Sequence, residues 1–206
     1  MSEDAPRLYL ITPPLVDAVA FSVTFEAALA AADVACVLLR FDPRAHAGAV
    51  AKKLLALAQP RGVACLVGDP QLAGAIEADG VHVSAPGDAL DAALKAMKPN
   101  HIVGVGGLVS RDDAMAAGES GADYLMFGGP DTPQAFGEIR ERIAWWAEIF
   151  NLPCVAYAHQ IAEVAGFVEM AADFIALETA VWDDPRGPGA AVADVNRLLA
   201  RGRTGA

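Results

Sequence analysis

The stretch EADGVHV at residues 77–83 recurs along the chain in related forms. The copies are GADYLMF at 121–127, AADFIAL at 171–177 and, more loosely, AADVACV at 31–37. The third residue of each copy is Asp, and four mostly apolar residues follow it. Successive copies start 46, 44 and 50 residues apart. A recurrence at this period indicates that the chain is built from four similar supersecondary units.

Each unit contains two strands and two helices. Runs rich in Val, Ile, Leu and Phe without strict alternation are typical of strands buried on both faces. The four copies supply four such strands, and four more are predicted at 7–12, 62–68, 101–107 and 152–158. Amphipathic or alanine-rich stretches fill the gaps and predict helices over 22–32, 44–58, 70–78, 88–97, 110–119, 135–150, 160–170 and 190–201.

Strict alternation of eight strands with eight helices requires parallel strands joined by right-handed crossovers. We therefore predict a (β/α)₈ TIM barrel, α/β in class, that occupies residues 1–206 as one domain. An open doubly wound sheet is the alternative, although no GxGxxG turn follows the first strand. Residues 182–191 are predicted to form a loop, and 202–206 a disordered tail.

In such a barrel the repeated Asp starts every second strand at the N-terminal face, where residues serve stability rather than chemistry. We expect Asp33, Asp79, Asp123 and Asp173 to accept hydrogen bonds from N–H groups of the turns. The small residues that precede each Asp are expected to end a helix and to let it pack closely on the next strand. The repeat thus concerns folding, and function is expected at the opposite ends of the strands.

Composition excludes several classes of protein. The net charge of −11 leaves no basic surface for nucleic acid or for an anionic membrane. Apolar runs are interrupted by Gly, Pro or charge before they reach the ~20 residues of a membrane helix. The acidic N-terminus does not resemble a signal peptide. Cys36, Cys65 and Cys154 lie in apolar runs and are predicted to be buried, reduced thiols of a cytoplasmic protein.

Charged residues follow three of the predicted strands. Arg40 closes an apolar strand, where an unpaired cation is costly. It is expected to pair with Asp42 or Asp69, or to bind a phosphate or carboxylate ligand. Asp69, together with Asp42 or Asp88, offers oxygen ligands for Mg²⁺. In the sequence GDPQLA, Asp69 is equally suited to cap the next helix.

Glycine pairs end two further strands. Gly106, Gly107, Gly128 and Gly129 either let a ligand approach backbone N–H groups or form tight turns. His82, in mid-strand, is expected to point into the barrel, as a core histidine or a catalytic one. A short helix opened by Thr179 is predicted to face a phosphate group. The other polar candidates at strand ends are Thr12, Ser84, Asp131, Thr132, Tyr157, His159 and Glu178.

These motifs, in this order, resemble the thiamine phosphate synthase family and its sister group, the thiazole tautomerases. The similar stretches are RLYLIT, LLRFD, LVGDP, EADGVHVSAPGD, IVGVGG and SGADYLMFGGPDTP, which together span residues 7 to about 182. The resemblance implies a (β/α)₈ barrel that joins a pyrimidine pyrophosphate to a thiazole phosphate and releases pyrophosphate with Mg²⁺. Arg40 then matches the pyrophosphate-binding arginine, and Asp69 matches a metal-binding aspartate. Either Asp88, which is offset by one residue in its loop, or no residue matches the second metal-binding aspartate.

Other positions depart from the family pattern. Asp42 replaces a lysine, Gly68 an asparagine and Gly106 a serine, and the loop after the sixth strand keeps Thr132 but has no lysine. The histidine expected of a tautomerase right after the fifth strand is absent from the sequence. From the strand ends we predict that a small phosphorylated molecule binds through the groups at Arg40, Gly106, Gly107, Gly128, Gly129, Thr132, His159 and Thr179.

Two functions follow from this pattern. One is a divergent thiamine phosphate synthase-like enzyme with a degenerate pyrophosphate site. The other is a non-catalytic or repurposed barrel of the same family that binds another phosphorylated or small molecule.

In the predicted helix 135–150, Ile139, Ile143 and Trp146 share the face toward the barrel. Trp145 and Ile149 lie on the flank, either as a homodimer contact or as the edge of a wide apolar face.

Overall fold

Eight parallel strands close into a barrel in the computed structural model, which describes residues 5–132 and 134–201. The strands follow one another in chain order around the barrel, and β8 pairs with β1. That pairing confirms the predicted TIM barrel and excludes the open sheet. The strands are β1 (Arg7–Ile11), β2 (Val34–Leu38), β3 (Ala64–Val67), β4 (Gly80–Val83), β5 (Ile102–Val105), β6 (Tyr124–Phe127), β7 (Cys154–Ala158) and β8 (Phe174–Leu177).

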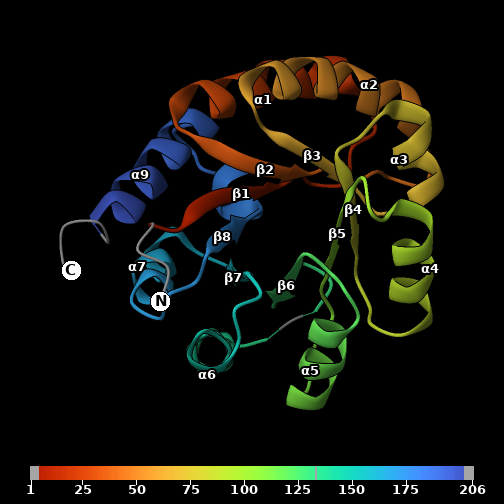
Figure 1. Ribbon diagram of the computed structural model, residues 1–206. Helices are drawn as coiled ribbons and strands as arrows, with labels where there is room; N and C mark the ends of the chain where they lie inside the picture. The colour runs from red at the N-terminus through yellow and green to blue at the C-terminus, as the bar shows by residue number, and fades with distance from the viewer. Residues whose placement is uncertain (1–4, 133, 202–206) are drawn as a thin grey trace.

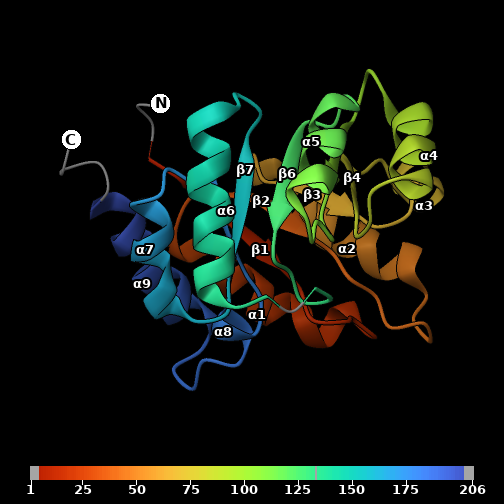
Figure 2. The same ribbon diagram turned by 90° about the horizontal axis from the view of Figure 1, so that it is seen from below.

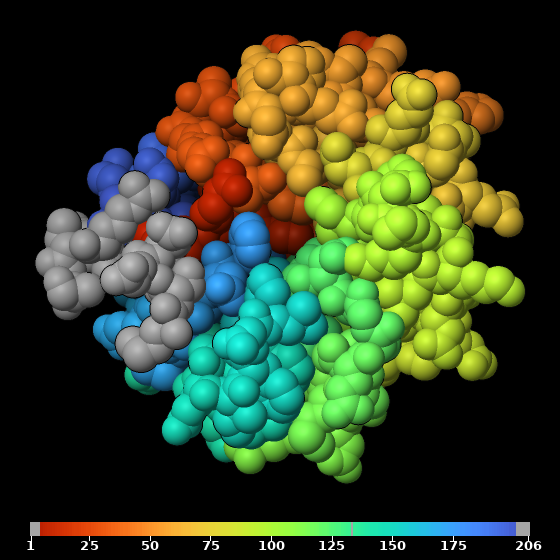
Figure 3. All heavy atoms as spheres, viewed as in Figure 1, coloured from red at the N-terminus to blue at the C-terminus, as the bar shows by residue number. Residues whose placement is uncertain are grey.

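Helices surround the strands in chain order (Figures 1 and 3). Figure 2 shows α6 lying over β6 and β7, and α8 at the end of the barrel where the strands finish. The helices are α1 (Ala18–Ala31), α2 (Ala47–Ala58), α3 (Pro70–Ile76), α4 (Asp88–Met97), α5 (Arg111–Glu119), α6 (Phe136–Ile149), α7 (Val164–Val168), α8 (Thr179–Trp182) and α9 (Pro188–Arg201), with 3₁₀ turns at η1 (Gln59–Arg61) and η2 (Ile161–Glu163).

The helix predictions differ from the structure mainly at helix starts. α1 begins a turn before residue 22 because the Asp17 carboxylate accepts a hydrogen bond from the Val19 N–H and caps the helix there. The predicted loop over 182–191 is wrong at both ends, since α8 includes Trp182 and α9 starts at Pro188, a favoured first helical residue. The predicted tail 202–206 lies outside the described residues.

Three of the four repeated aspartates tie neighbouring strands together at the N-terminal face. The carboxylate of Asp79 accepts from the Cys65 N–H at 2.7 Å, Asp123 from Val103 at 2.7 Å, and Asp173 from Cys154 at 2.9 Å. The donors are therefore strand N–H groups near the starts of β3, β5 and β7, and the expectation of turn N–H donors is wrong. Each carboxylate thus fixes the register of two adjacent strands.

The residue that opens each of these three copies ends the preceding helix. Glu77, Gly121 and Ala171 have φ values of 59°, 97° and 58°, in the left-handed region that commonly terminates helices. The looser copy at 31–37 lacks both features. Asp33 is exposed, and among the described residues it pairs only with the Arg7 side chain, at 3.4 Å. The register between β1 and β2 shifts between Leu8 and Tyr9.

Two apolar layers fill the structure. Ile139, Ile143 and Trp146 of α6 are buried, which confirms the predicted inward face of that helix.

Cys36, Cys65 and Cys154 are buried and free, as predicted. Burial raises the pKa of the Cys65 and Cys154 thiols to about 12, so both are inert thiols. Across residues 5–132 and 134–201, no helix is long and apolar enough to cross a membrane.

Candidate active site at the mouth of the barrel

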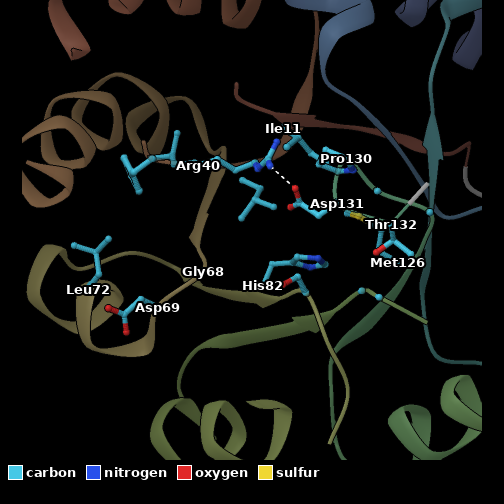
Figure 4. A pocket seen from close by; sticks show the side chains of 18 residues that line it. Ile11, Arg40, Gly68, Asp69, Leu72, His82, Met126, Pro130, Asp131 and Thr132 are labelled. Atoms are coloured by element: carbon cyan, nitrogen blue, oxygen red, sulfur yellow. Dashed lines mark hydrogen bonds and ion pairs between the residues drawn. The ribbon is translucent and has the colours of Figure 1, made fainter. Parts of the chain in front are cut away.

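A pocket of about 310 Å³ opens at the C-terminal ends of the strands (Figure 4). Its wall comes from Ile11 at the end of β1 and from the ends of β2 to β6 with the loops that follow them, which is where TIM barrels place their chemistry. The lining includes seven of the predicted site residues: Arg40, Asp69, Gly106, Gly107, Gly128, Gly129 and Thr132.

Arg40 is held between two carboxylates. Its Nη1 donates to Oε1 of Glu178 at 2.7 Å, and its Nη2 donates to Oδ1 of Asp131 at 2.7 Å (Figure 4). Its backbone N–H donates to Oγ1 of the fully buried Thr12 at 2.9 Å. The guanidinium therefore has a fixed position on the pocket wall. The expectation that Arg40 pairs with Asp42 or Asp69 is wrong.

Closure of the barrel explains this arrangement. Because β8 pairs with β1 and β1 pairs with β2, the residues that follow these three strands meet on one side of the mouth. Glu178 follows β8, Thr12 follows β1, and Arg40 closes β2. An acidic residue at the end of a buried strand is the sequence feature that could have identified Glu178 as the partner of Arg40.

The two carboxylates differ in environment. Glu178 is buried, whereas the Asp131 side chain is 62% exposed on the loop after β6. Burial raises the pKa of Glu178, and the positive charge of Arg40 opposes that rise. The Tyr157 hydroxyl donates to Oε2 of Glu178 at 3.5 Å, and burial together with the Glu178 charge raises the pKa of Tyr157 to about 12. Asp131 is thus the partner that an incoming anion can replace at lower cost.

The carboxylate at Asp42 is neutralised locally. Arg44 donates to it from Nε at 2.8 Å, from Nη2 at 2.9 Å and from its backbone N–H at 2.9 Å. These bonds with Arg44 lower the pKa of Asp42 to about 2. Asp42 is not among the residues that line the pocket. The charge reversal at this position is therefore offset by an arginine two residues later.

Asp69 contributes one carboxylate to the lining of the pocket. Its Oδ1 accepts from the Gln71 N–H at 2.9 Å, so Asp69 caps α3 as predicted. In Figure 4 it lies beside Leu72, away from the pair of Arg40 and Asp131. Asp88 is the exposed first residue of α4 and does not line the pocket. In the part of the chain that the structure describes, no three His, Cys, Asp or Glu side chains are grouped to hold a metal ion.

The glycine pairs shape the loops of the mouth. Gly128 has φ 78°, and a Cβ there would lie 2.6 Å from Cδ1 of Ile139, so a larger residue would disturb the packing of α6. A Cβ on Gly106 would lie 3.0 Å from Nε2 of His82, which makes Gly106 the residue that leaves room beside this histidine. The pairs serve as tight turns and also keep the pocket open.

His82 forms the floor of the pocket and points into the barrel, as predicted. Its Nδ1 lies 2.8 Å from the Tyr124 hydroxyl. Burial lowers the pKa of His82 to about 4, so the ring is neutral near pH 7.

Two further predicted residues lie outside the pocket lining. His159 follows β7; its backbone N–H donates to Glu163 at 2.7 Å and its Nδ1 lies 3.6 Å from the same carboxylate. Thr179 is exposed at the start of the four-residue helix α8, which confirms the predicted short helix.

The closed barrel and its pocket define a (β/α)₈ protein of the kind that takes small ligands at the C-terminal ends of its strands. Residues 8–181 match the thiamine monophosphate synthase family. The thiamine-phosphate synthase of Rhodospirillum centenum is 43% identical over 202 residues, covering 94% of this chain and 97% of the relative. That of Hyphomonas neptunium is 38% identical over 208 residues, covering 94% and 93%. The chain belongs to the thiamine monophosphate synthase family.

Solved structures agree in fold. A thiamine phosphate pyrophosphorylase from Pyrococcus furiosus superposes with a TM-score of 0.80 at 21% identity, covering 97% of this chain and 98% of the other. A 3-hexulose-6-phosphate synthase from Salmonella typhimurium superposes with a TM-score of 0.77 at 17% identity, covering 94% and 99%. Because a second activity shares the barrel, the chemistry must be argued from the pocket itself.

Proposed function

We propose that this protein is a thiamine phosphate synthase, which joins a hydroxymethylpyrimidine pyrophosphate to a thiazole phosphate and releases pyrophosphate. The observation that carries the proposal is Arg40, which lines the pocket and is held in place by Thr12 and Glu178. An oriented guanidinium can donate two parallel hydrogen bonds to phosphate oxygens. Family membership supplies the identity of the substrates.

In this reaction the bond between the pyrimidine methylene carbon and the pyrophosphate oxygen breaks, and a bond from that carbon to the thiazole nitrogen forms. The leaving group takes the electron pair of the broken bond and departs as pyrophosphate. Arg40 lies where it can bind the negative charge that develops on this group. Asp131 must release the Nη2 of Arg40 for that contact, and Glu178 keeps the arginine oriented.

Backbone groups and Thr132 support the same role. Gly129 and Thr132 belong to one turn of the loop after β6, in which the Thr132 N–H donates to the Gly129 carbonyl at 3.2 Å. Gly106, Gly107 and Gly128 border the same pocket and offer close approach to the chain. We assign these residues to substrate binding. His159 and Thr179 remain predicted phosphate contacts at the ends of β7 and β8.

Magnesium fits the donor chemistry of the pocket in part. Asp69 offers one carboxylate, and Mg²⁺ commonly uses one or two protein carboxylates together with substrate phosphates. Asp88 is the second candidate ligand. Bound there, the ion would neutralise charge on the leaving pyrophosphate.

Calorimetric titration with pyrophosphate, with and without Mg²⁺, tests the site. Arg40→Ala should weaken binding about tenfold to a hundredfold, because it removes charge-assisted hydrogen bonds of about 1.5–3 kcal/mol. Arg140→Ala is the matched control, since Arg140 is exposed on α6, outside the pocket lining, and forms an ion pair with Glu169 at 3.7 Å. Equal affinities of wild type and Arg40→Ala would overturn the assignment of Arg40.

The alternative function is a repurposed or non-catalytic barrel that binds another small phosphorylated molecule. It is favoured by the surroundings of Arg40, because the carboxyl groups of both Glu178 and Asp131 already contact its one guanidinium. The lysines that the family pattern places near the pyrophosphate are also replaced, at Asp42 and after β6. Folded protein that binds neither pyrophosphate nor thiamine phosphate in the presence of Mg²⁺ would establish this alternative.

A homodimer through α6 and a cytoplasmic location are also proposed. Ile149 is 60% exposed on the flank of α6, which supports a contact there. The Trp145 ring is already partly covered by the Arg111 guanidinium, 4.9 Å above it, and by Phe150. Sedimentation equilibrium of wild type and Ile149→Asp should show a dimer that the substitution dissociates, and a monomeric wild type would refute the contact. Buried, free thiols support the cytoplasmic location.

A further inference from the structure

Three buried side chains form a hydrogen-bonded chain beneath the pocket. The His82 Nδ1 lies 2.8 Å from the Tyr124 hydroxyl, and that hydroxyl lies 3.0 Å from the hydroxyl of Tyr9. The residues come from β4, β6 and β1, so the chain crosses the interior of the barrel. It links the pocket floor to a second cavity of about 210 Å³ that Tyr9 and Tyr124 line.

The packing of the barrel interior holds these three hydrogen-bonded side chains in place. A Cβ on Gly104 would lie 1.9 Å from Cζ of Tyr124, so the Tyr124 ring occupies the space that a side chain at 104 would fill. The His82 and Tyr124 rings are nearly parallel, with centroids 5.7 Å apart, and Tyr9 meets Tyr124 edge-on at 6.0 Å. The three rings therefore have little freedom to exchange partners.

The positions of the hydroxyl hydrogens determine which residue donates and which accepts along the hydrogen-bonded series of Tyr9, Tyr124 and His82. If Tyr9 donates to Tyr124, then Tyr124 donates to His82 Nδ1, and every hydroxyl hydrogen has an acceptor. In the reverse direction His82 Nδ1–H donates to Tyr124, Tyr124 donates to Tyr9, and the Tyr9 hydroxyl is left to donate to the Cys36 thiol, a weak acceptor. A buried hydroxyl gains more from an oxygen or imidazole nitrogen acceptor than from sulfur, which favours the first direction.

The first direction fixes the tautomer of His82. With Nδ1 accepting, the proton of the neutral ring resides on Nε2. The Nε2 atom borders the pocket beside Gly106, where the missing side chain leaves open space. A hydrogen-bond donor is thereby presented from an otherwise apolar floor that includes Ile11, Leu38 and Met126.

We propose that the chain Tyr9–Tyr124–His82 holds His82 in the Nε2–H tautomer, so that His82 donates a hydrogen bond to an acceptor nitrogen of a heteroaromatic ring seated on the pocket floor. His82 is then a specificity-determining residue, and Tyr124 and Tyr9 are positioning residues. The identity of that ring as the pyrimidine of the substrate rests on the proposed function. The tautomer itself does not.

The tautomer is measured first, on wild-type protein without ligand. Two-bond ¹⁵N–¹H correlation spectra of histidine-labelled protein distinguish the two neutral forms, and the spectrum of His82→Asn assigns the signal among the four histidines. A protonated Nε2 and an accepting Nδ1 are expected at pH 7. A protonated Nδ1 would overturn the proposal, whatever the protein catalyses.

The ligand contact is measured next, with hydroxymethylpyrimidine pyrophosphate and with an analogue whose ring lacks nitrogen. Wild type should favour the pyrimidine by about fivefold to tenfold in KM, the equivalent of one hydrogen bond. Tyr124→Phe should abolish this preference and leave kcat within about twofold, because the bond serves binding rather than chemistry. Tyr9→Phe should retain most of the preference, because Tyr124 can still donate to His82.

An unchanged preference in folded Tyr124→Phe would overturn the positioning role. If the protein lacks turnover, the same comparison is made by calorimetry with the two pyrophosphates. Loss of the proposed reaction together with a protonated Nε2 and retained ring preference would refute the function and leave this inference standing.

Discussion

The repeated aspartates offer a test of why the chain repeats itself. Asp173→Ala removes the carboxylate that accepts from the Cys154 N–H at 2.9 Å. Asp79→Ala removes the acceptor of the Cys65 N–H at 2.7 Å and of the Gln59 amide at 3.1 Å. Asp33→Ala is a control within the same repeat, because the Asp33 carboxylate pairs with the exposed Arg7 side chain, at 3.4 Å, in place of a strand N–H.

The expected magnitudes follow from these contacts. A hydrogen bond to a charged acceptor contributes about 1.5–3 kcal/mol, and its loss leaves a strand N–H without a partner. We expect Asp173→Ala to lower the free energy of unfolding by about 2 kcal/mol, which lowers Tm by about 4–8 °C in a domain of this size. Asp79→Ala should cost slightly more. Asp33→Ala should cost less than about 1 kcal/mol, as an exposed pair does.

Thermal unfolding followed by circular dichroism, with urea midpoints at a fixed temperature, measures these differences. The reasoning is refuted if the variant at position 33 is destabilised as much as those at 79 and 173. It is refuted equally if all three variants unfold within about 2 °C of wild type, since the carboxylates would then not secure the strands.

Three further predictions address the interior and the mouth. Gly104→Ala should destabilise the protein by about 1–3 kcal/mol, because its Cβ would lie 1.9 Å from the Tyr124 ring; an unchanged Tm would contradict this packing. The pKa of His82 is lowered to about 4 from 6.5, so the unfolded state binds more protons between these values. Stability from His82 is present above pH 6.5 and is lost as pH falls toward 4; about 2 kcal/mol should be lost between pH 7 and 4.5, and urea midpoints of His82→Phe should lack that component. Asp131→Asn should tighten pyrophosphate binding about twofold to fivefold by calorimetry, because it frees the Arg40 guanidinium from an exposed ion pair, and weaker binding would argue against competition.

Much of the architecture is readable in the chain because the repeat carries it. Buried parallel strands are continuous apolar runs, and their alternation with helices admits few topologies. The closing pair of β8 with β1 is not a local property, but it follows once eight units are counted. The first residue of a helix is harder to predict from the sequence, since the start of α1 is set by a single capping residue, Asp17.

The site was predictable in its place and less so in its contacts. Strand ends indicate which residues reach the mouth, and Arg40, Asp69 and the glycines do line the pocket. The partners of Arg40 were missed because they lie 91 and 138 residues away in sequence. Asp42, its neighbour in sequence, is taken by Arg44. The contact between the Tyr124 hydroxyl and His82 joins β6 to β4 and depends on the space left at Gly104 in β5, which no local pattern reveals.

Formation of thiamine phosphate by the purified protein, from hydroxymethylpyrimidine pyrophosphate and thiazole phosphate with Mg²⁺, tests the central claim most directly. The account predicts turnover by wild type and by Arg140→Ala, and a loss of kcat/KM of about tenfold to a hundredfold in Arg40→Ala. Folded wild-type protein that forms no product would contradict it, and so would an Arg40→Ala variant as active as wild type.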